Sequence, residues 1–258
     1  MALPDRSYQW FSEFQTHHRT LAADIEGMDS CDSPGKLASA SHFSKTAPDA
    51  DRDSYAAVVL ARLILLAFLQ GQGWLDRGDP WYLQNKLGQS QQRGPDRFYR
   101  EFFQSLCLQG IALPTEERTA AIAVMIGDVP YLGGCLFQPH PLEQRYPQIS
   151  IGDRSFEAIL TWFSDYRWQW HEPADLNQPD PTGELAQHPP TITLALLRQS
   201  FQYFANSLTS GRPYALAPET VQATCDRVIL GQLVSQLADG QNSDYHPDYQ
   251  DDSQPNDG

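Results

Sequence analysis

Cysteine is scarce in this sequence of 258 residues, and the cysteines that occur are widely spaced. They form no C-x-x-C pair, whereas structural zinc sites and disulfide frameworks need closely grouped cysteines. The spacing therefore favours buried free thiols in a reducing cytosol. The residues concerned are Cys31, Cys107, Cys135 and Cys225.

Motifs of self-contained catalytic sites are also missing. The histidines, including the adjoining His17 and His18, form neither H-x-x-x-H nor H-E-x-x-H, the spacings typical of a metal site. A G-x-S-x-G nucleophile turn and a glycine-rich phosphate loop are absent as well. We therefore expect no catalytic, cofactor-binding or metal-binding residue in this chain.

A membrane-spanning segment is not predicted either. Residues 1–10 have no apolar core of the kind that export signals carry. The longest apolar run, Tyr55 to Leu69, is short for a bilayer and is interrupted by Arg62. We interpret the run as a buried helix of a cytoplasmic protein with no membrane partner.

Acidic charge is abundant. The chain contains 18 Lys and Arg against 32 Asp and Glu, which gives a net charge of −14. Six of the aspartates lie in residues 239–258, which contain no Lys or Arg, and the others are spread over the rest of the chain. Such a charge repels nucleic acid and anionic membranes unless a local basic patch overrides it.

The apolar pattern predicts a mainly α fold, an irregular multi-helix bundle with a short β pair near Ile149. An apolar content of 41% is enough for a packed core. Apolar residues recur every three or four positions in most of the expected helices. These helices are 6–25, from Asp53 or Ser54 to Gln70, 80–87, 95–108, 115–126, one capped by Asp153, 191–208 and 218–238.

Breaks in the pattern divide the chain into regions. Residues 1–172 form the expected helical domain, within which residues 31–51 are a loop. Residues 173–190, rich in Pro, Asp and Gln, are an expected linker, and 191–238 contain the C-terminal helices. Residues 239–258 are an expected acidic, disordered tail.

Four segments, taken in order, resemble the helical region that precedes the methyltransferase domain in fused type IIG restriction–modification enzymes. They are Tyr55 to Leu87, Arg97 to Phe103, Val129 to Phe137 and Ile149 to Trp170, and Glu219 to Leu233 looks like the helix leading into the cofactor-binding core. In that family, one polypeptide joins a nuclease, a helical connector, an N6-adenine DNA methyltransferase and a target-recognition domain. The resemblance implies S-adenosylmethionine and magnesium as cofactors of the family.

The catalytic motifs of that family are absent here. D-P-x-x-G-x-G is not found, and Asp180 to Gly183 lacks its second glycine. His188 to Thr191 has His where the N-P-P-Y/F tetrapeptide needs a side-chain amide, and the expected G-x-Y-Y-T-P is missing near Asp175 to Leu194. No acidic residue stands two positions before Lys36, Lys45 or Lys86, so the E-x-K or D-x-K spacing of a restriction nuclease is missing too.

Two groups of residues are candidates for contacts. Arg93, Arg97 and Arg100 could bind DNA phosphate, although a solvated helix face paired with Asp96 and Glu101 explains them better. Trp168 and Trp170 could stack on bases, but we favour partner-interface or core anchors at a helix end. Gly133 and Gly134 are expected to hold a turn that seats Tyr131 and Phe137 in the core.

The leading hypothesis is a non-catalytic helical part, split or truncated, of a type IIG-like protein. Its partner is a methyltransferase domain or subunit, and it meets DNA only within that complex. Such a connector is expected to expose apolar surface when alone. The alternatives are a subunit that completes a split methyltransferase in trans, and an acidic protein that inhibits a DNA enzyme.

Overall fold

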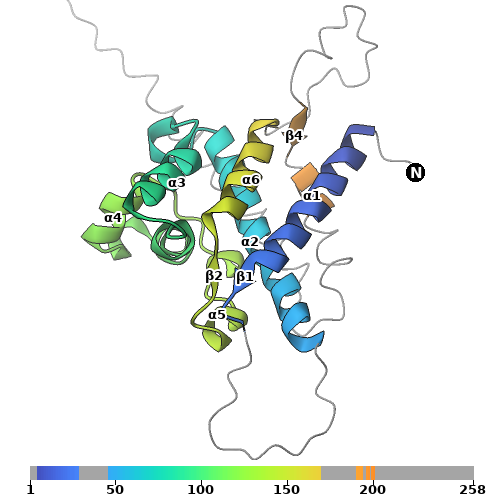
Figure 1. The fold of residues 1–258 in the computed structure, drawn as a ribbon. Coiled ribbons are helices and arrows are strands. Elements are labelled where there is room, and N and C mark those ends of the chain that lie inside the picture. Colours follow the sequence, from blue (N-terminus) through green and yellow to red (C-terminus); the bar gives the residue numbers. More distant parts are fainter. Residues whose placement is uncertain (1–4, 29–45, 170–189, 194–195, 198, 201–258) are drawn as a thin grey trace, which may run out of the picture.

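The computed structural model describes residues 5–28, 46–169, 190–193, 196–197 and 199–200. Over these ranges the fold is mainly α with two small two-stranded sheets, as predicted. Helices α1, α2 and α6 form the body, and the other helices lie along one side (Figure 1). The expected tail, Trp170, and all of the expected linker except Pro190 lie outside the described residues.

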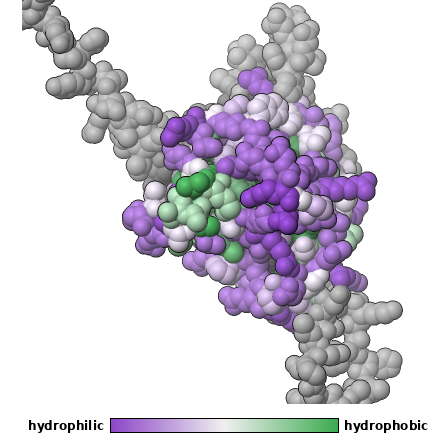
Figure 2. Space-filling view, turned by 60° about the vertical axis from the view of Figure 1, so that its left-hand side comes forward, coloured by the Kyte–Doolittle hydropathy of each residue, from purple (hydrophilic) through white to green (hydrophobic). Residues whose placement is uncertain are grey.

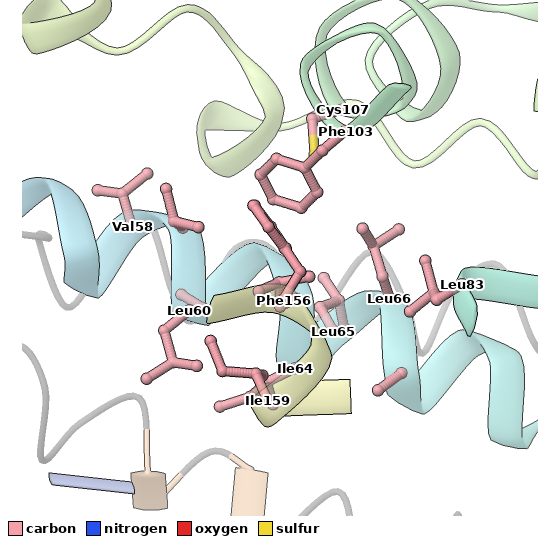
Figure 3. Packing of buried hydrophobic residues seen from close by; sticks show 14 of the residues in the cluster. Val58, Leu60, Ile64, Leu65, Leu66, Leu83, Phe103, Cys107, Phe156 and Ile159 are labelled. Carbon is pink, nitrogen blue, oxygen red and sulfur yellow. The ribbon is translucent and has the colours of Figure 1, made fainter. Parts of the chain in front are cut away.

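Helix α2 (Thr46–Gly71) is the centre of the core. From Tyr55 to Leu69 every residue is buried. Its side chains meet those of Leu83, Phe103 and Ile159 from the surrounding helices (Figure 3). The helix begins earlier than predicted, inside the expected loop 31–51, because Pro48 and Asp49 suit the first turn of a helix.

Helix α2 also passes the length and composition test for crossing a membrane, over Asp49–Gly71. However, 89% of its most apolar window is buried inside the structure. It is therefore the core helix of the fold, consistent with a soluble protein.

Helix α1 (Asp5–Asp24) packs on α2 and on α6 (Asp153–Ser164), and Phe156 and Ile159 of α6 lie in the core beside α2 (Figure 3). After α1, strand β1 (Ile25–Glu26) pairs antiparallel with β2 (Ser150–Ile151), which confirms the short β pair near Ile149. Asp153 does not cap α6, because Gly152 occupies the N-cap position. The Asp153 carboxylate instead accepts hydrogen bonds from the backbone amides of Asp96 and Phe98, both at 3.0 Å.

The segment predicted as an α-helix over 95–108 is mostly π-helical, in η2 (Phe98–Phe103) and η3 (Leu106–Ile111). A π-helix has i→i+5 hydrogen bonds, so residues five apart share a face. Phe98 and Phe103 accordingly both pack on Phe156 of α6, with ring centroids 4.9 and 5.4 Å away. The α-helical prediction was therefore wrong in its period.

The remaining helices form the rim of the fold. Helix α3 (Tyr82–Arg93) is as long as α6 and contributes side chains to the core, and the others are shorter. Helix α3 extends beyond the predicted end at Leu87. The expected helix 115–126 is divided into η4 (Thr115–Glu117) and α4 (Ala120–Ile126), because Arg118 and Thr119 have extended backbones. The other short helices are η1 (Asp76–Gly78), η5 (Cys135–Phe137) and α5 (Pro141–Arg145).

Strand β3 (Arg167–Gln169) pairs in parallel with β4 (Thr191–Thr193). A helix was predicted from Thr191, but its first residues, Thr-Ile-Thr, are β-branched and favour a strand. Ile192 and Leu197 are buried in the same core as α2. The rest of the predicted C-terminal helices, from residue 201, lies outside the described residues.

Candidate interaction surface

Helix α4 has the most apolar exposed surface of the rim. Its sequence is AAIAVMI, yet only Ile126 is buried. Val124 has an exposed fraction of 84%, Ile122 and Met125 are half-buried, and three alanines are exposed. With the left-hand side of Figure 1 turned forward, Figure 2 shows green surface gathered in one patch surrounded by purple. We call the exposed side chains of Ala120–Met125 the α4 patch.

One apolar face of α4, with Ile122, Met125 and Ile126, packs against the core, and hydrogen bonds at its ends add to this attachment. At the C-terminal end, the Lys86 ammonium donates to the carbonyl of Met125 at 2.7 Å, and the Tyr82 hydroxyl donates to that of Ile126 at 2.6 Å. At the N-terminal end, Thr119 Oγ1 accepts from the amide of Ile122. These bonds satisfy terminal backbone groups of the helix and leave the face with Ala120, Ala121, Ala123 and Val124 exposed.

Two further features hold α4 at the rim. Gly127 follows it with φ 75° and ψ −153°, a conformation close to glycine-only territory, and lies against Asp76. The Arg118 guanidinium donates to the carbonyls of Leu113 at 3.1 Å and Val129 at 2.9 Å, which joins the two chain segments flanking α4. Burial lowers the pKa of Arg118, against the opposite effects of Asp128 and Glu116.

Acidic side chains flank the α4 patch at both ends. Glu116 and Glu117 precede the helix, Asp128 follows it, and all three residues are exposed. None of them takes part in an ion pair among the described residues. The exposed side chains along this stretch are therefore acidic, apolar and acidic in order, with the half-buried Arg118 between Glu117 and the helix.

A polar hollow of about 380 Å³ lies beside Lys86, whose ammonium binds the C-terminal end of α4. Asp76 and Asp79 contribute carboxylates to its lining, together with amide side chains of α3. The backbone amide of Asp76 donates to the carbonyl of Asp128, so the hollow is joined to the acidic end of the patch.

No protein-family model matches this chain, and no curated protein or solved structure is similar to it. The resemblance to type IIG enzymes thus rests on the sequence segments alone. Among the described residues, no three His, Cys, Asp or Glu side chains are grouped so as to hold a metal ion.

The three candidate arginines are bound within the fold. Arg97 donates to Glu101 at 2.7 Å, and Arg93 lies 3.4 Å from the same carboxylate. Arg100 donates to the backbone carbonyls of Ile149 and Gln148. The arginines therefore lie near one another on η2 and the end of α3, with Glu101 compensating part of their charge.

The candidate aromatic residues separate into buried and exposed ones. Phe137 is fully buried, whereas Tyr131 has an exposed fraction of 50%, so its expected place in the core was wrong. The amides of Leu132 and Gly133 both donate to the carbonyl of Ile111, and this anchor buries Leu132 instead of its neighbour. Gly133 and Gly134 have positive φ, as their predicted role in the turn requires.

Trp168 lies in strand β3, not at a helix end as expected, and is half-buried. Its indole N–H donates to the carbonyl of Phe163 at 3.3 Å, and its ring meets that of Trp10 edge-on. It is therefore attached to the core on one side.

The largest buried polar network was not foreseen. The Arg62 guanidinium donates to Glu143 Oε1 at 2.6 Å and to the carbonyls of Leu136 and Gln138 at 2.7 and 2.8 Å. The Tyr55 hydroxyl donates to the same Glu143 oxygen at 2.7 Å. Arg62 thus fixes η5 and α5 to the middle of α2, and its isolation in an apolar run was the available signal.

The pKa values of the groups in this network fit a structural role away from solvent. Burial by itself raises the pKa of Glu143, but the attraction of Arg62 and the hydrogen bonds lower it below its ordinary value. Burial raises the pKa of the Cys107 thiol to about 12, so this cysteine is an unreactive free thiol, as predicted from its spacing. The network can hold segments together, but it presents no reactive group to solvent.

Proposed function

We propose that this chain is a non-catalytic helical scaffold that docks onto a partner through the α4 patch. The partner, as the sequence resemblance implies, is the methyltransferase domain of a type IIG-like restriction–modification protein in the cytoplasm. The observation that carries the proposal is that α4, an entirely apolar helix, packs on the core through Ile122, Met125 and Ile126 but leaves Val124 and its alanines exposed. Exposed apolar patches on folded proteins mark interaction sites.

The energetics favour docking. Val124 is 84% exposed, and fully burying a side chain of its size contributes about 1.5–3 kcal/mol. Ile122 and Met125 are already half-buried against the core, so covering their remaining exposed parts contributes less. Together these residues offer a partner the central, dry cluster on which protein interfaces depend. The stable attachment of α4 keeps this cluster preorganised, which reduces the entropy lost on binding.

A role as scaffold explains the arginines better than direct DNA binding does. Arg93 and Arg97 share Glu101, and Arg100 is bound to backbone carbonyls, so their charge is partly compensated. The chain as a whole carries a net charge of −14, which opposes a phosphate backbone. DNA then reaches this chain only within the complex.

The test uses Val124→Asp, which places a charge in the patch without changing the core. The full chain is titrated into the methyltransferase core of a type IIG enzyme from which the helical connector has been removed, and binding is measured by calorimetry. We expect the variant to bind at least about tenfold more weakly, because the buried carboxylate lacks a partner.

Thr161→Asp is the matched control, since Thr161 is also a β-branched, exposed helical residue but lies on α6. It should bind as the unaltered chain does. Absence of binding by the unaltered chain, or equal weakening by both substitutions, would reject the proposed function.

A further inference from the structure

We propose that the partner element covering the α4 patch is an amphipathic helix whose apolar face is flanked by Lys or Arg at both ends. This inference rests on the proposed docking function and specifies the chemistry of the docked segment. It follows from the order of acidic, apolar and acidic groups along the rim.

The dimensions fit one helix. Seven residues of α-helix are about 10 Å long, and a helix packed on another contacts it over two or three turns. The exposed apolar residues of α4 form a single short ridge, opposite the face that packs on the core. Its C-terminal end is held by polar contacts to α3, and Thr119 caps its N-terminal end. A partner helix crossing this ridge covers Val124 and its neighbours and extends over the acidic residues beyond.

The acidic residues beside the ridge favour a partner helix with basic residues at its ends. Glu116 and Glu117 lie at one end of the ridge and Asp128 at the other, and none forms an ion pair among the described residues. Arg118 compensates part of the charge of Glu116 and Asp128, but its guanidinium is bound to the carbonyls of Leu113 and Val129, and the acidic groups remain in excess. Beside the second end, Asp76 and Asp79 line the hollow. The resident cation there, Lys86, is directed to the carbonyl of Met125 and lies over the rings of Tyr82 and Phe102.

The same charges disfavour the other occupants. In a pair of identical chains, the acidic ends of one α4 patch meet the acidic ends of the other, and both chains carry a net charge of −14. Like charges placed opposite each other destabilise an interface. The segment 239–258 of this chain, with its six Asp and no basic residue, is repelled in the same way.

Synthetic peptides test the inference on the full chain. One peptide has Leu at helical positions i, i+3, i+4 and i+7 with Lys at both ends, and its matched control has Glu in place of each Lys. Binding is followed by calorimetry at low and high salt. We expect the Lys peptide to bind at least about tenfold more tightly than the Glu peptide, with a preference that salt reduces.

Variants of the chain show whether the surface is the one proposed. Glu117→Lys with Asp128→Lys should reverse the preference towards the Glu peptide, and Val124→Asp should weaken both peptides. Asp165→Lys, an exposed acidic residue at the end of α6, should leave the preference unchanged.

The inference is overturned by equal binding of the two peptides, by no binding of either, or by self-association of the chain through α4. If the peptides fail while the methyltransferase core binds, the docking function stands and only the chemistry assigned here is wrong. If the Lys peptide binds while the core does not, the inference stands and the assigned partner is wrong.

Discussion

At the residue scale, His140 is a titratable group beside the buried Arg62–Glu143 pair. Its Nδ1 accepts a hydrogen bond from the amide of Leu142, so the ring caps α5 in its neutral form. Burial, reinforced by the charge of Arg62, lowers the pKa of His140 from 6.5 to about 4. The folded protein therefore resists protonation at a position where the unfolded chain does not.

This difference predicts a pH dependence of stability. Between pH 6.5 and 4, His140 is protonated in the unfolded chain but stays neutral in the folded protein. The free energy of unfolding therefore falls as pH falls. One pKa unit corresponds to about 1.4 kcal/mol, and we expect a total loss of roughly 2 kcal/mol from this residue after partial exposure is considered. His140→Asn keeps a capping oxygen and should lack this loss.

Urea denaturation of both proteins across that range measures the effect. His17, whose pKa burial also lowers, contributes with the same sign in both proteins, so it cancels in the comparison. Parallel stability curves for the two proteins would show that His140 does not titrate as described.

At the scale of elements, the long helices could be predicted from local sequence patterns, whereas the bounds and positions of the short helices at the rim could not. Trp10, Phe14 and Leu21 recur at the helical period and are buried, because one face of α1 meets the core. The position of η4 and α4 depends instead on Arg118 and Lys86, which contact backbone carbonyls that no periodicity reveals. The π-helical period likewise depends on Phe156, more than fifty positions away.

The α4 patch had an indirect signal in the sequence. A connector removed from its partner was expected to expose apolar surface, but the pattern did not show where. The run AAIAVMI is equally compatible with a buried helix, and only tertiary structure leaves it at the surface. The arginine cluster was found from sequence because its members lie close together along the chain.

Two glycines give a paired prediction for α3 and the turn after α4. Gly127→Ala should lower the free energy of unfolding by about 2 kcal/mol, because φ is +75° and the new Cβ meets Asp76. Gly88→Ala should raise it by up to about 1 kcal/mol, because Gly88 lies within helix α3 and a methyl group there meets nothing within 4 Å.

Thermal and urea unfolding of the two variants measure these effects. Destabilisation by Gly88→Ala would contradict the described helix, and a neutral Gly127→Ala would show that the turn after α4 adopts another conformation.

At the scale of the whole molecule, Trp10 joins segments distant in sequence. Its ring stacks on Trp162 with centroids 4.5 Å apart, and its indole N–H donates to Ser200 Oγ at 2.9 Å. Glu13 on the same helix accepts from Trp162 Nε1 and from the Tyr166 hydroxyl, both at 2.6 Å. Helices α1 and α6 and residues around Ser200 therefore share one packed layer.

This arrangement predicts cooperative unfolding. Trp10→Ala should reduce the free energy of unfolding by about 3–5 kcal/mol, and Trp10→Phe by less, because the ring contacts are partly kept. In urea, near-ultraviolet and far-ultraviolet circular dichroism should give coincident transitions for the unaltered chain and for Trp10→Phe. Separate transitions would mean that α1 folds independently of the rest.

The buried arginine of α2 has a consequence before folding is complete. As the nascent chain emerges from the ribosome, Asp49–Gly71 is long and apolar enough to be a substrate for the membrane insertion machinery. Arg62 lies near its middle, where an arginine raises the free energy of insertion by about 2.5–3.5 kcal/mol. The charge that later pairs with Glu143 therefore also biases the unfinished polypeptide away from the lipid bilayer.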